Sequence, residues 1–180
     1  MKFEALRVQD ALLITPDVFG DQRGFFFESW RQDQYREKGI GPEFVQDNHS
    51  RSTRGVLRGL HFQLNRPQGK LVRCVVGEIF DVIVDLRRSS PTFGRWHAVT
   101  LSAENHQMLW VPPGMAHGFQ VTSEVAEMVY KCTEYYAPED EYSLLWNDPE
   151  LAIEWPMPEM ALLSDKDLAG NTIASSPTFA

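Results

Sequence analysis

A chain of 180 residues that is 43% hydrophobic suits a single domain, residues 1–180, with one buried core. Its formal net charge of −8 argues against general nucleic-acid binding, which needs a broad basic face. No apolar run approaches the roughly eighteen residues of a membrane-spanning helix and the N-terminus lacks a signal-peptide core, so we expect a cytoplasmic protein with no membrane partner.

Short helices are expected on either side of a series of strands. Residues 29–38 begin with Ser-x-x-Gln and end before Gly39, and residues 164–169 begin with Ser-x-x-Asp and end before Gly170; both are helix-capping patterns. Between them, β-branched and aromatic residues alternate between turns rich in Gly, Pro and Asn. The expected strands are residues 55–62, 70–76, 79–86, 96–101, 107–111, 118–121 and 125–133. This pattern is typical of an all-β antiparallel sandwich or barrel.

Both cysteines lie inside these segments. Cys74 and Cys132 stand among alternating apolar residues. That setting favours two reduced thiols in the core over a disulfide, a metal pair or a nucleophile.

A basic block interrupts the acidic sequence. Residues 48–77 contain six Lys or Arg and no Asp or Glu, and Arg58, His61 and Lys70 stand there among apolar, strand-forming neighbours. A local cationic patch that contains a titratable base predicts a small anionic ligand and proton chemistry. A regular pleat would send Arg58 and His61 to opposite faces, so a shared pocket requires a bulge or twist at Gly59.

Each candidate residue has a structural interpretation beside the chemical one. A strand histidine is often a hydrogen-bonded structural residue, but for His61 a nearby cation such as Lys70 would tune the base and stabilise an oxyanion. Tyr130 is either a general acid or a buried tyrosine with its hydroxyl satisfied. Asp167, the third residue after Ser164, is where a helix-capping carboxylate belongs.

Two further residues also allow both a structural and a functional interpretation. His117 follows the turn formed by residues 112–115 and either orients that turn or points into a pocket. Arg23 stands among phenylalanines that either belong to the core or stack on a flat ring while the guanidinium binds a phosphate. Three consecutive aromatics at 25–27 cannot all face one side of a strand.

Motifs in a fixed order along almost the whole chain carry a resemblance to a known family. They are residues 19–29 (FGDQRGFFFES), 44–50 (FVQDNHS), 57–63 (LRGLHFQ), 68–73 (QGKLVR), 90–94 (SPTFG), 101–105 (LSAEN), 116–119 (AHGF) and 145–149 (LWNDP). With them the sequence resembles the dTDP-4-dehydrorhamnose 3,5-epimerase family, which makes the L-rhamnose precursor from a nucleotide-linked 4-keto-6-deoxyglucose. The resemblance implies a cupin-type jelly roll with a few short peripheral helices, usually a homodimer, that needs no cofactor.

The resemblance also implies catalytic roles. It places the base at His61, its orienting carboxylate at Asp167, the acid at Tyr130 and the cation that stabilises the enolate at Lys70. A C–H beside a ketone is a weak acid, so a base and a cationic donor must act together. Inversion then needs a proton from the opposite face, and a phenol with a pKa of ~10 is protonated at neutral pH. Asp167 would accept the second N–H of His61 and fix its tautomer.

Nucleotide and diphosphate recognition is implied for a larger set of residues. These are Phe19, Arg23, Phe26, Glu28, Gln46, Asn48, Arg58, His117, Tyr136, Glu141 and Lys166. The three aromatic members are expected to pack around the thymidine. Two departures from the family pattern stand out. Tyr142 replaces a small residue and bears on the geometry around Glu141, and the atypical tail after Asp167 bears on how the C-terminal segment closes.

Three other functions compete with double epimerisation. A metal-dependent cupin should show His-x-His in its first motif, but Gln63 follows His61 and Phe62, so we predict no metal requirement. A non-catalytic nucleotide-sugar binding protein would need the arginines of the pocket but not His61, Tyr130 and Asp167 together. An epimerase acting on C3 or C5 alone keeps most of the same residues, and the rhamnose-pathway motifs favour action at both carbons.

Overall fold

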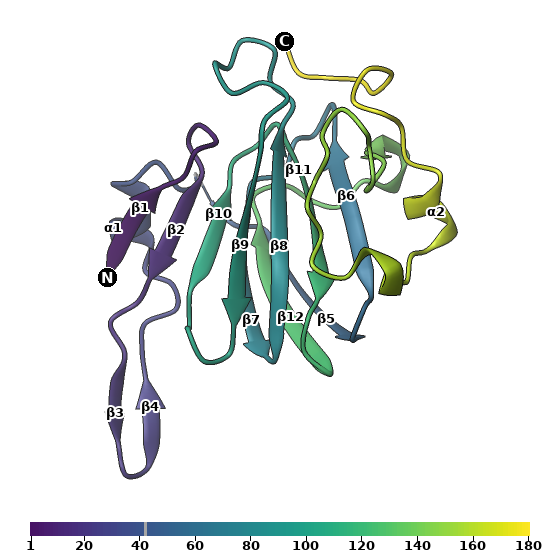
Figure 1. Ribbon diagram of the computed structural model, residues 1–180. Coiled ribbons are helices and arrows are strands. Elements are labelled where there is room, and N and C mark those ends of the chain that lie inside the picture. Colours follow the sequence, from purple (N-terminus) through teal and green to yellow (C-terminus); the bar gives the residue numbers. More distant parts are fainter. Residues whose placement is uncertain (42) are drawn as a thin grey trace.

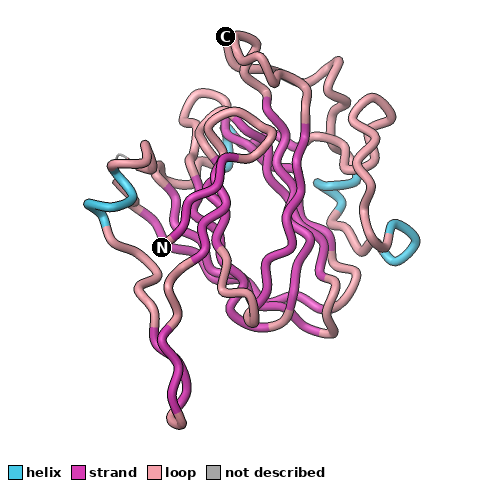
Figure 2. Tube along the Cα trace, turned by 60° about the vertical axis from the view of Figure 1, so that its left-hand side comes forward, coloured by secondary structure: helices cyan, strands magenta, loops and turns pink. Residues whose placement is uncertain are grey.

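Two antiparallel sheets surround a common interior in the computed structural model, which describes residues 1–41 and 43–180 (Figures 1 and 2). One sheet has the strand order β1 (Lys2–Ala5), β2 (Leu12–Thr15), β10 (Met108–Val111), β7 (Lys70–Val76), β12 (Val125–Cys132), β5 (Gln46–Thr53). The other has the order β13 (Glu141–Ser143), β6 (Leu57–Gln63), β11 (Met115–Val121), β8 (Glu78–Asp85), β9 (Trp96–Ser102). This arrangement confirms the expected all-β, cupin-type jelly roll.

The apolar residues divide into three clusters that follow the layers of the fold. The interior cluster takes side chains from both sheets, including Val72 and Met128 from one and Ile83 and Phe119 from the other. The C-terminal segment covers the outer face of the five-stranded sheet, where Trp155 packs near Phe80. The third cluster lies on the outer face of the six-stranded sheet under the N-terminal region. Strand residues therefore alternate between the interior and one of the two outer layers.

All seven predicted strands are present, with ends shifted by a few residues. Sequence reasoning missed six others. Strand β5 has the sequence Gln-Asp-Asn-His-Ser-Arg-Ser-Thr and carries no apolar alternation; β1, β2 and β13 are short, and β3 (Phe19–Asp21) and β4 (Gly24–Phe26) form a separate hairpin.

The helices are short and peripheral, as expected. Helix α2 (Asp165–Leu168) begins after Ser164, whose side chain accepts a hydrogen bond from the backbone N–H of Asp167. Helix α1 (Gln32–Arg36) begins later than predicted: its N-cap is Arg31, without a side-chain cap, so Ser29 is not the cap. Two turns of 3-10 helix cover Pro138–Asp140 and Pro158–Met160. No helix in the described part of the chain has the length and apolar composition needed to cross a membrane.

The predicted irregularity at Gly59 is present. His61 pairs with His117 and Arg58 pairs with Phe119, so three steps along β6 match only two along β11. The extra residue brings Arg58 and His61 to the same face, while Leu57 and Leu60 point into the outer cluster. Gly59 has φ +112°, and a Cβ there would lie 2.6 Å from the Cα of Gly118. The close approach of the two strands thus requires glycine.

The hairpin β3–β4 projects away from both sheets (Figure 1). Phe19 and Phe26 are each 66% exposed, and Phe25 is 64% exposed. Arg23, in the turn, pairs with Asp21 of the same hairpin at 2.5 Å. The aromatic residues of this motif are therefore not core residues of this chain.

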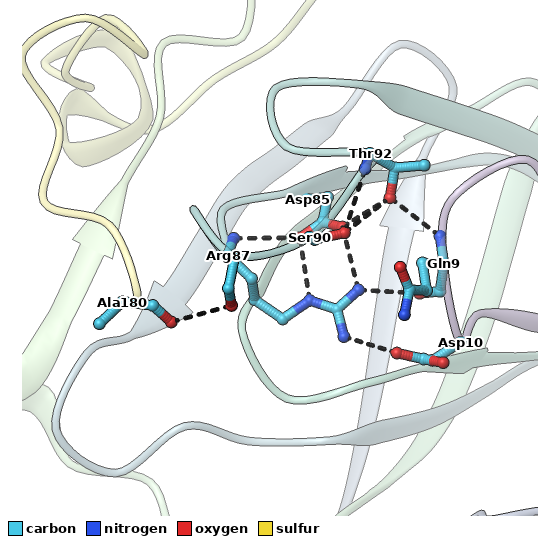
Figure 3. Close-up of polar contacts among 8 residues, drawn as sticks. Gln9, Asp10, Asp85, Arg87, Ser90, Thr92 and Ala180 are labelled. Carbon is cyan, nitrogen blue, oxygen red and sulfur yellow. Dashed lines mark hydrogen bonds and ion pairs between the residues drawn. The ribbon is translucent and has the colours of Figure 1, made fainter.

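A buried carboxylate links two segments at the end of the fold opposite the hairpin. Asp85, at the end of β8, accepts hydrogen bonds from Arg87, Ser90 and Thr92, and Arg87 in turn contacts Asp10 (Figure 3). Burial opposes ionisation of this group, but these hydrogen bonds outweigh it and hold the pKa of Asp85 below its ordinary value. The network joins the N-terminal loop to the turn after β8.

Both cysteines are free and buried, as predicted.

Candidate active site

A cavity of about 340 Å³ opens at one end of the interior, between the two sheets. Its lining combines residues of six strands with Tyr136 and Gln68 from loops. Nine of the predicted site residues line it: Gln46, Asn48, Arg58, His61, Lys70, His117, Tyr130, Tyr136 and Glu141. The structure thus brings together residues that lie up to 95 positions apart in the sequence, from 46 to 141.

Strand alternation explains why these side chains converge. On β7, Lys70 has the same orientation as Val72 and Cys74, which belong to the interior cluster, whereas Leu71 belongs to the outer one. On β12, Tyr130 packs against the interior cluster. In each strand the polar residue extends an apolar interior row toward the open end.

His61 is held by a carboxylate from the far end of the chain. Its Nε2 lies 2.5 Å from Oδ1 of Asp167, and Oδ2 of Asp167 accepts a hydrogen bond from the hydroxyl of Ser164 at 2.8 Å. Asp167 is therefore both the capping partner of α2 and the partner of His61. Burial opposes its ionisation, but the hydrogen bond with His61 and the interaction with Ser164 leave the pKa of Asp167 below its ordinary value. An ionised Asp167 fixes the Nε2–H tautomer and leaves the lone pair on Nδ1.

Glu141 lies on the other side of the imidazole. Its Oε1 is 3.8 Å from Nδ1 of His61, and its Oε2 accepts hydrogen bonds from Lys166 at 2.7 Å and from the hydroxyl of Tyr136 at 2.9 Å. Burial opposes ionisation of Glu141, yet these partners hold its pKa below the ordinary value. Tyr142, the departure from the family pattern, stacks on Phe62 in the outer cluster and leaves these contacts intact.

The phenol and the ammonium that the chemistry needs both face this cavity. Burial, followed by the neighbouring thiol of Cys132, raises the pKa of Tyr130, so its hydroxyl keeps its proton at neutral pH. Burial lowers the pKa of Lys70. A cation with little water around it interacts more strongly with a developing negative charge than an exposed one does.

His117 points into the pocket and not at the turn before it. It is 6% exposed, and its Nε2 lies 2.8 Å from Oδ1 of Asp81 on β8. Sequence reasoning did not single out Asp81. The signal was there: it is the one charged residue inside the otherwise apolar stretch 79–84, where a period of two directs it to the interior.

Six predicted site residues lie outside this cavity. Lys166 and Asp167 stand behind its wall on α2 and reach it through Glu141 and His61. The remaining members are all on or next to the exposed hairpin: Phe19, Arg23, Phe26 and Glu28. Within one chain, therefore, these four residues do not meet the catalytic candidates.

The cavity also has lining residues that were not predicted. Ser50, Gln68, Gly118, Phe119 and Met128 complete its wall. Their types are ordinary for strands and turns, so only the fold identifies them. Among the described residues, no three His, Cys, Asp or Glu side chains are grouped as a metal-ion ligand set.

The tail that departs from the family pattern closes over the five-stranded sheet. The backbone of Asn171 pairs with Ser143 and Leu145, and Ile173 is buried in the outer cluster. This segment holds α2, and with it Asp167, against β6.

Comparison with known proteins identifies close relatives. A family model described as dTDP-4-dehydrorhamnose 3,5-epimerase matches residues 5–175. The dTDP-4-dehydrorhamnose 3,5-epimerase of Pseudomonas aeruginosa is 56% identical over 180 residues, covering 99% of each chain. The crystal structure of a Legionella pneumophila dTDP-6-deoxy-D-glucose-3,5-epimerase in complex with dTDP-4-keto-L-rhamnose superimposes with a TM-score of 0.95 at 49% identity, covering 98% of this chain and 94% of that one. A 3'-monoepimerase from Streptomyces bikiniensis in complex with dTDP-quinovose gives a TM-score of 0.88 at 36% identity, covering 94% and 87%.

Proposed function

This chain belongs to the dTDP-4-dehydrorhamnose 3,5-epimerase family, and we propose that it inverts C3 and C5 of dTDP-4-dehydro-6-deoxy-D-glucose to give dTDP-4-dehydro-L-rhamnose. The observation that carries this proposal is that His61, Lys70 and Tyr130 line one cavity while Asp167 holds the imidazole from behind. A binding protein would not need this set. We also assign the enzyme to the cytoplasm as part of this proposal.

The proposed reaction begins at the C–H bond beside the ketone. Nδ1 of His61 removes the proton, and the electron pair of the broken bond forms the enolate, whose negative oxygen lies against the ammonium of Lys70. Asp167 stabilises the imidazolium that results. Tyr130 then gives its phenolic proton to the same carbon from the opposite face and recovers a proton from solvent. His61 releases the abstracted proton to solvent, and repetition of both steps at the second carbon completes the conversion.

Recognition of the nucleotide is assigned to the polar wall of the cavity and to the hairpin. Arg58 suits the diphosphate because its guanidinium donates N–H groups to anionic oxygens, and His117 lines the same wall with its Nε2 held by Asp81. Tyr136 lies at the same opening and would pack on the thymine ring, with Gln46 and Asn48 next to it. Lys166 and Glu141 would close the sugar end.

We further propose that the enzyme is a homodimer in which the hairpin of one subunit enters the cavity of the other. Phe19, Arg23, Phe26 and Glu28 are implied in nucleotide binding by the family motif, yet they lie on a projecting hairpin with three exposed phenylalanines. An apolar, exposed arm of this kind marks a surface that a partner covers. A second copy satisfies both requirements.

The alternative is inversion at a single carbon, the activity that the name of the Streptomyces bikiniensis protein gives for that enzyme. Proton NMR of the purified protein with the 4-keto sugar nucleotide in heavy water separates the two. We expect exchange at both C3 and C5, and incorporation at one carbon alone would establish the narrower activity. His61→Asn should abolish exchange at both positions and leave affinity for dTDP within about twofold, since the base contributes to turnover more than to binding; substantial surviving exchange would identify another base.

The prediction that no metal is required is tested in the same assay. Activity should be unchanged after treatment with a chelator. Loss of activity that a divalent ion restores would contradict it.

A further inference from the structure

Gln63 is a buried polar side chain that the proposed function does not use. It lies on β6 two residues beyond His61, is 3% exposed and lies outside the set of residues that line the cavity. Its Nε2 donates hydrogen bonds to the carbonyl oxygens of Arg66 at 2.8 Å and Tyr135 at 3.1 Å, and its Oε1 accepts one from the N–H of Ala137 at 2.9 Å. Both ends of the side-chain amide are therefore engaged with the backbone of loops.

Two of these three hydrogen bonds flank Tyr136. They hold the residue before it and the residue after it, and Oε1 of Gln46 on β5 accepts a hydrogen bond from the N–H of Tyr136 itself at 2.9 Å. The loop of residues 133–137 connects β12 to the 3-10 turn at residues 138–140. The backbone N–H groups of residues 135–137 all donate to side-chain oxygens. Side chains, and not a strand ladder, thus fix the path of this part of the loop.

The ring of Tyr136 is fixed at its two ends. Its backbone is held by Gln46 and by the contacts of Gln63, and its hydroxyl donates a hydrogen bond to Oε2 of Glu141 at 2.9 Å. Because Tyr136 is 51% exposed, packing against the protein does not set its position alone. A side chain that is already in place before a ligand arrives loses less conformational entropy on binding.

We propose that Gln63 is a positioning residue for the nucleotide: through the carbonyl of Tyr135 and the N–H of Ala137 it holds Tyr136 at the opening of the cavity. This inference rests on the proposed function, in which Tyr136 packs on the thymine ring. Gln63 contacts the loop from behind and acts on the nucleotide only through Tyr136. Its contribution is therefore to affinity and not to proton transfer.

Gln63→Met tests the proposal, because methionine has a similar length and lacks both the N–H donors and the carbonyl acceptor. The buried carbonyl of Tyr135 and the buried N–H of Ala137 then lose their partner, so the loop leaves its position in most molecules. If about a tenth of the molecules keep the loop in place, the apparent Kd for dTDP rises about tenfold. We expect calorimetric titration to show this rise and KM to follow it, with kcat within about twofold of wild type.

A second ligand and a second background show whether the effect passes through Tyr136. Pyrophosphate lacks the nucleoside and is assigned to Arg58, so its affinity should be the same in Gln63→Met and wild type within about twofold. In a Tyr136→Ala background, Gln63→Met should weaken dTDP binding by less than about twofold, because the ring that it positions is gone. An equal loss for pyrophosphate, or a full tenfold loss in the Tyr136→Ala background, would overturn the proposal.

Gln120→Met is the matched control. Gln120 on β11 is also buried and also holds a loop backbone: its Nε2 donates to the carbonyl of Met157 at 2.8 Å and its Oε1 accepts from the N–H of Met157 at 3.1 Å. The substitution should lower Tm and leave the Kd for dTDP unchanged. If Gln63→Met also lowers only Tm, Gln63 is structural and the proposal is wrong.

Hydrogen exchange of the unaltered, ligand-free protein covers the case in which Gln63→Met does not fold. The amide hydrogens of Tyr136 and Ala137 should exchange at least about 100-fold more slowly than in an unfolded peptide, and exchange at the unfolded rate would overturn the proposal. Neither this measurement nor the dTDP titration needs turnover. A failure of the epimerase assignment, seen as absent deuterium exchange into the substrate with wild type, is therefore distinguishable from a failure of the role given to Gln63.

Discussion

The imidazole of His61 lies between two carboxylates with different tasks. Asp167 is 2.5 Å from Nε2, whereas Glu141 is 3.8 Å from Nδ1 and is neutralised by Lys166. Only the first is within hydrogen-bond distance, so it sets the tautomer. Asp167 both contacts Ser164 at the start of α2 and holds His61, because its two carboxylate oxygens have different partners.

A substitution at Tyr130 can separate the removal of the substrate proton from the inversion of the carbon. Tyr130→Phe keeps the ring in the interior cluster and removes the proposed acid, so His61 can still exchange the substrate proton on its own face. We expect product formation to fall by about 10²–10⁴-fold, with deuterium exchange reduced much less. The measurement is NMR of substrate and product in heavy water.

Tyr142→Phe is the control for that variant, because its ring stacks on Phe62 and faces away from the cavity. It should retain wild-type exchange and turnover. Equal loss of exchange and inversion in Tyr130→Phe would show that the phenol is needed for proton removal as well, contrary to the proposed division of roles.

Among the elements, strands were predictable where burial forces alternation and not elsewhere. Strand β7 has the predicted bounds because Leu71, Val72 and Cys74 must be covered on both faces. Strand β5 shows no such pattern, since its inward residues Gln46, Asn48 and Ser50 line the polar cavity. The polar residues that prevent the prediction of β5 as a strand are the same residues that line the cavity.

The β6 bulge should be intolerant of any side chain. Gly59→Ala places a Cβ 2.6 Å from Gly118 at φ +112°, so the strands must separate and Arg58 and His61 lose their common face. We expect a loss of about 2–4 kcal/mol in the free energy of unfolding, and a larger proportional loss of activity. Denaturant unfolding and the exchange assay measure the two effects.

Gly39→Ala is the control that has backbone strain without a steric clash of the new side chain. Gly39 has φ +76°, but a Cβ there meets nothing within 4 Å. The substitution should lower the free energy of unfolding by about 1 kcal/mol, which is the cost of the backbone conformation alone. Equal destabilisation by the two substitutions would mean that the contact with Gly118 relaxes freely.

The Asp85 network predicts a specific acid sensitivity. Asp85→Asn removes the charge that Arg87 binds and should lower stability by about 3–5 kcal/mol, as for a broken buried ion pair. Because the folded pKa of Asp85 is depressed, the stabilisation is present above the unfolded pKa of about 3.9 and is lost as pH falls through the folded value. The difference in Tm between wild type and variant should thus shrink below pH 4. A constant difference down to pH 2 would assign the effect to packing.

At the scale of the whole molecule, the sequence predicts the candidate catalytic residues but not which chain's cavity the hairpin enters. Residue types and the family motif pointed to His61, Lys70, Tyr130 and Asp167, and strand alternation around one interior brings them together. The family motif named the four hairpin residues, but the sequence of one chain does not show which cavity the exposed hairpin enters.

Subunit complementation tests where the hairpin acts. His61→Asn inactivates the cavity of the chain that carries it, and Arg23→Ala inactivates the hairpin of the chain that carries it. The two positions lie in different parts of one chain. If the arm crosses to the partner, a mixed dimer contains one site with both defects and one with neither, so random re-pairing of two inactive proteins should restore about a quarter of wild-type activity. If each arm serves its own subunit, every site in the mixed dimer keeps one defect, and mixing restores nothing.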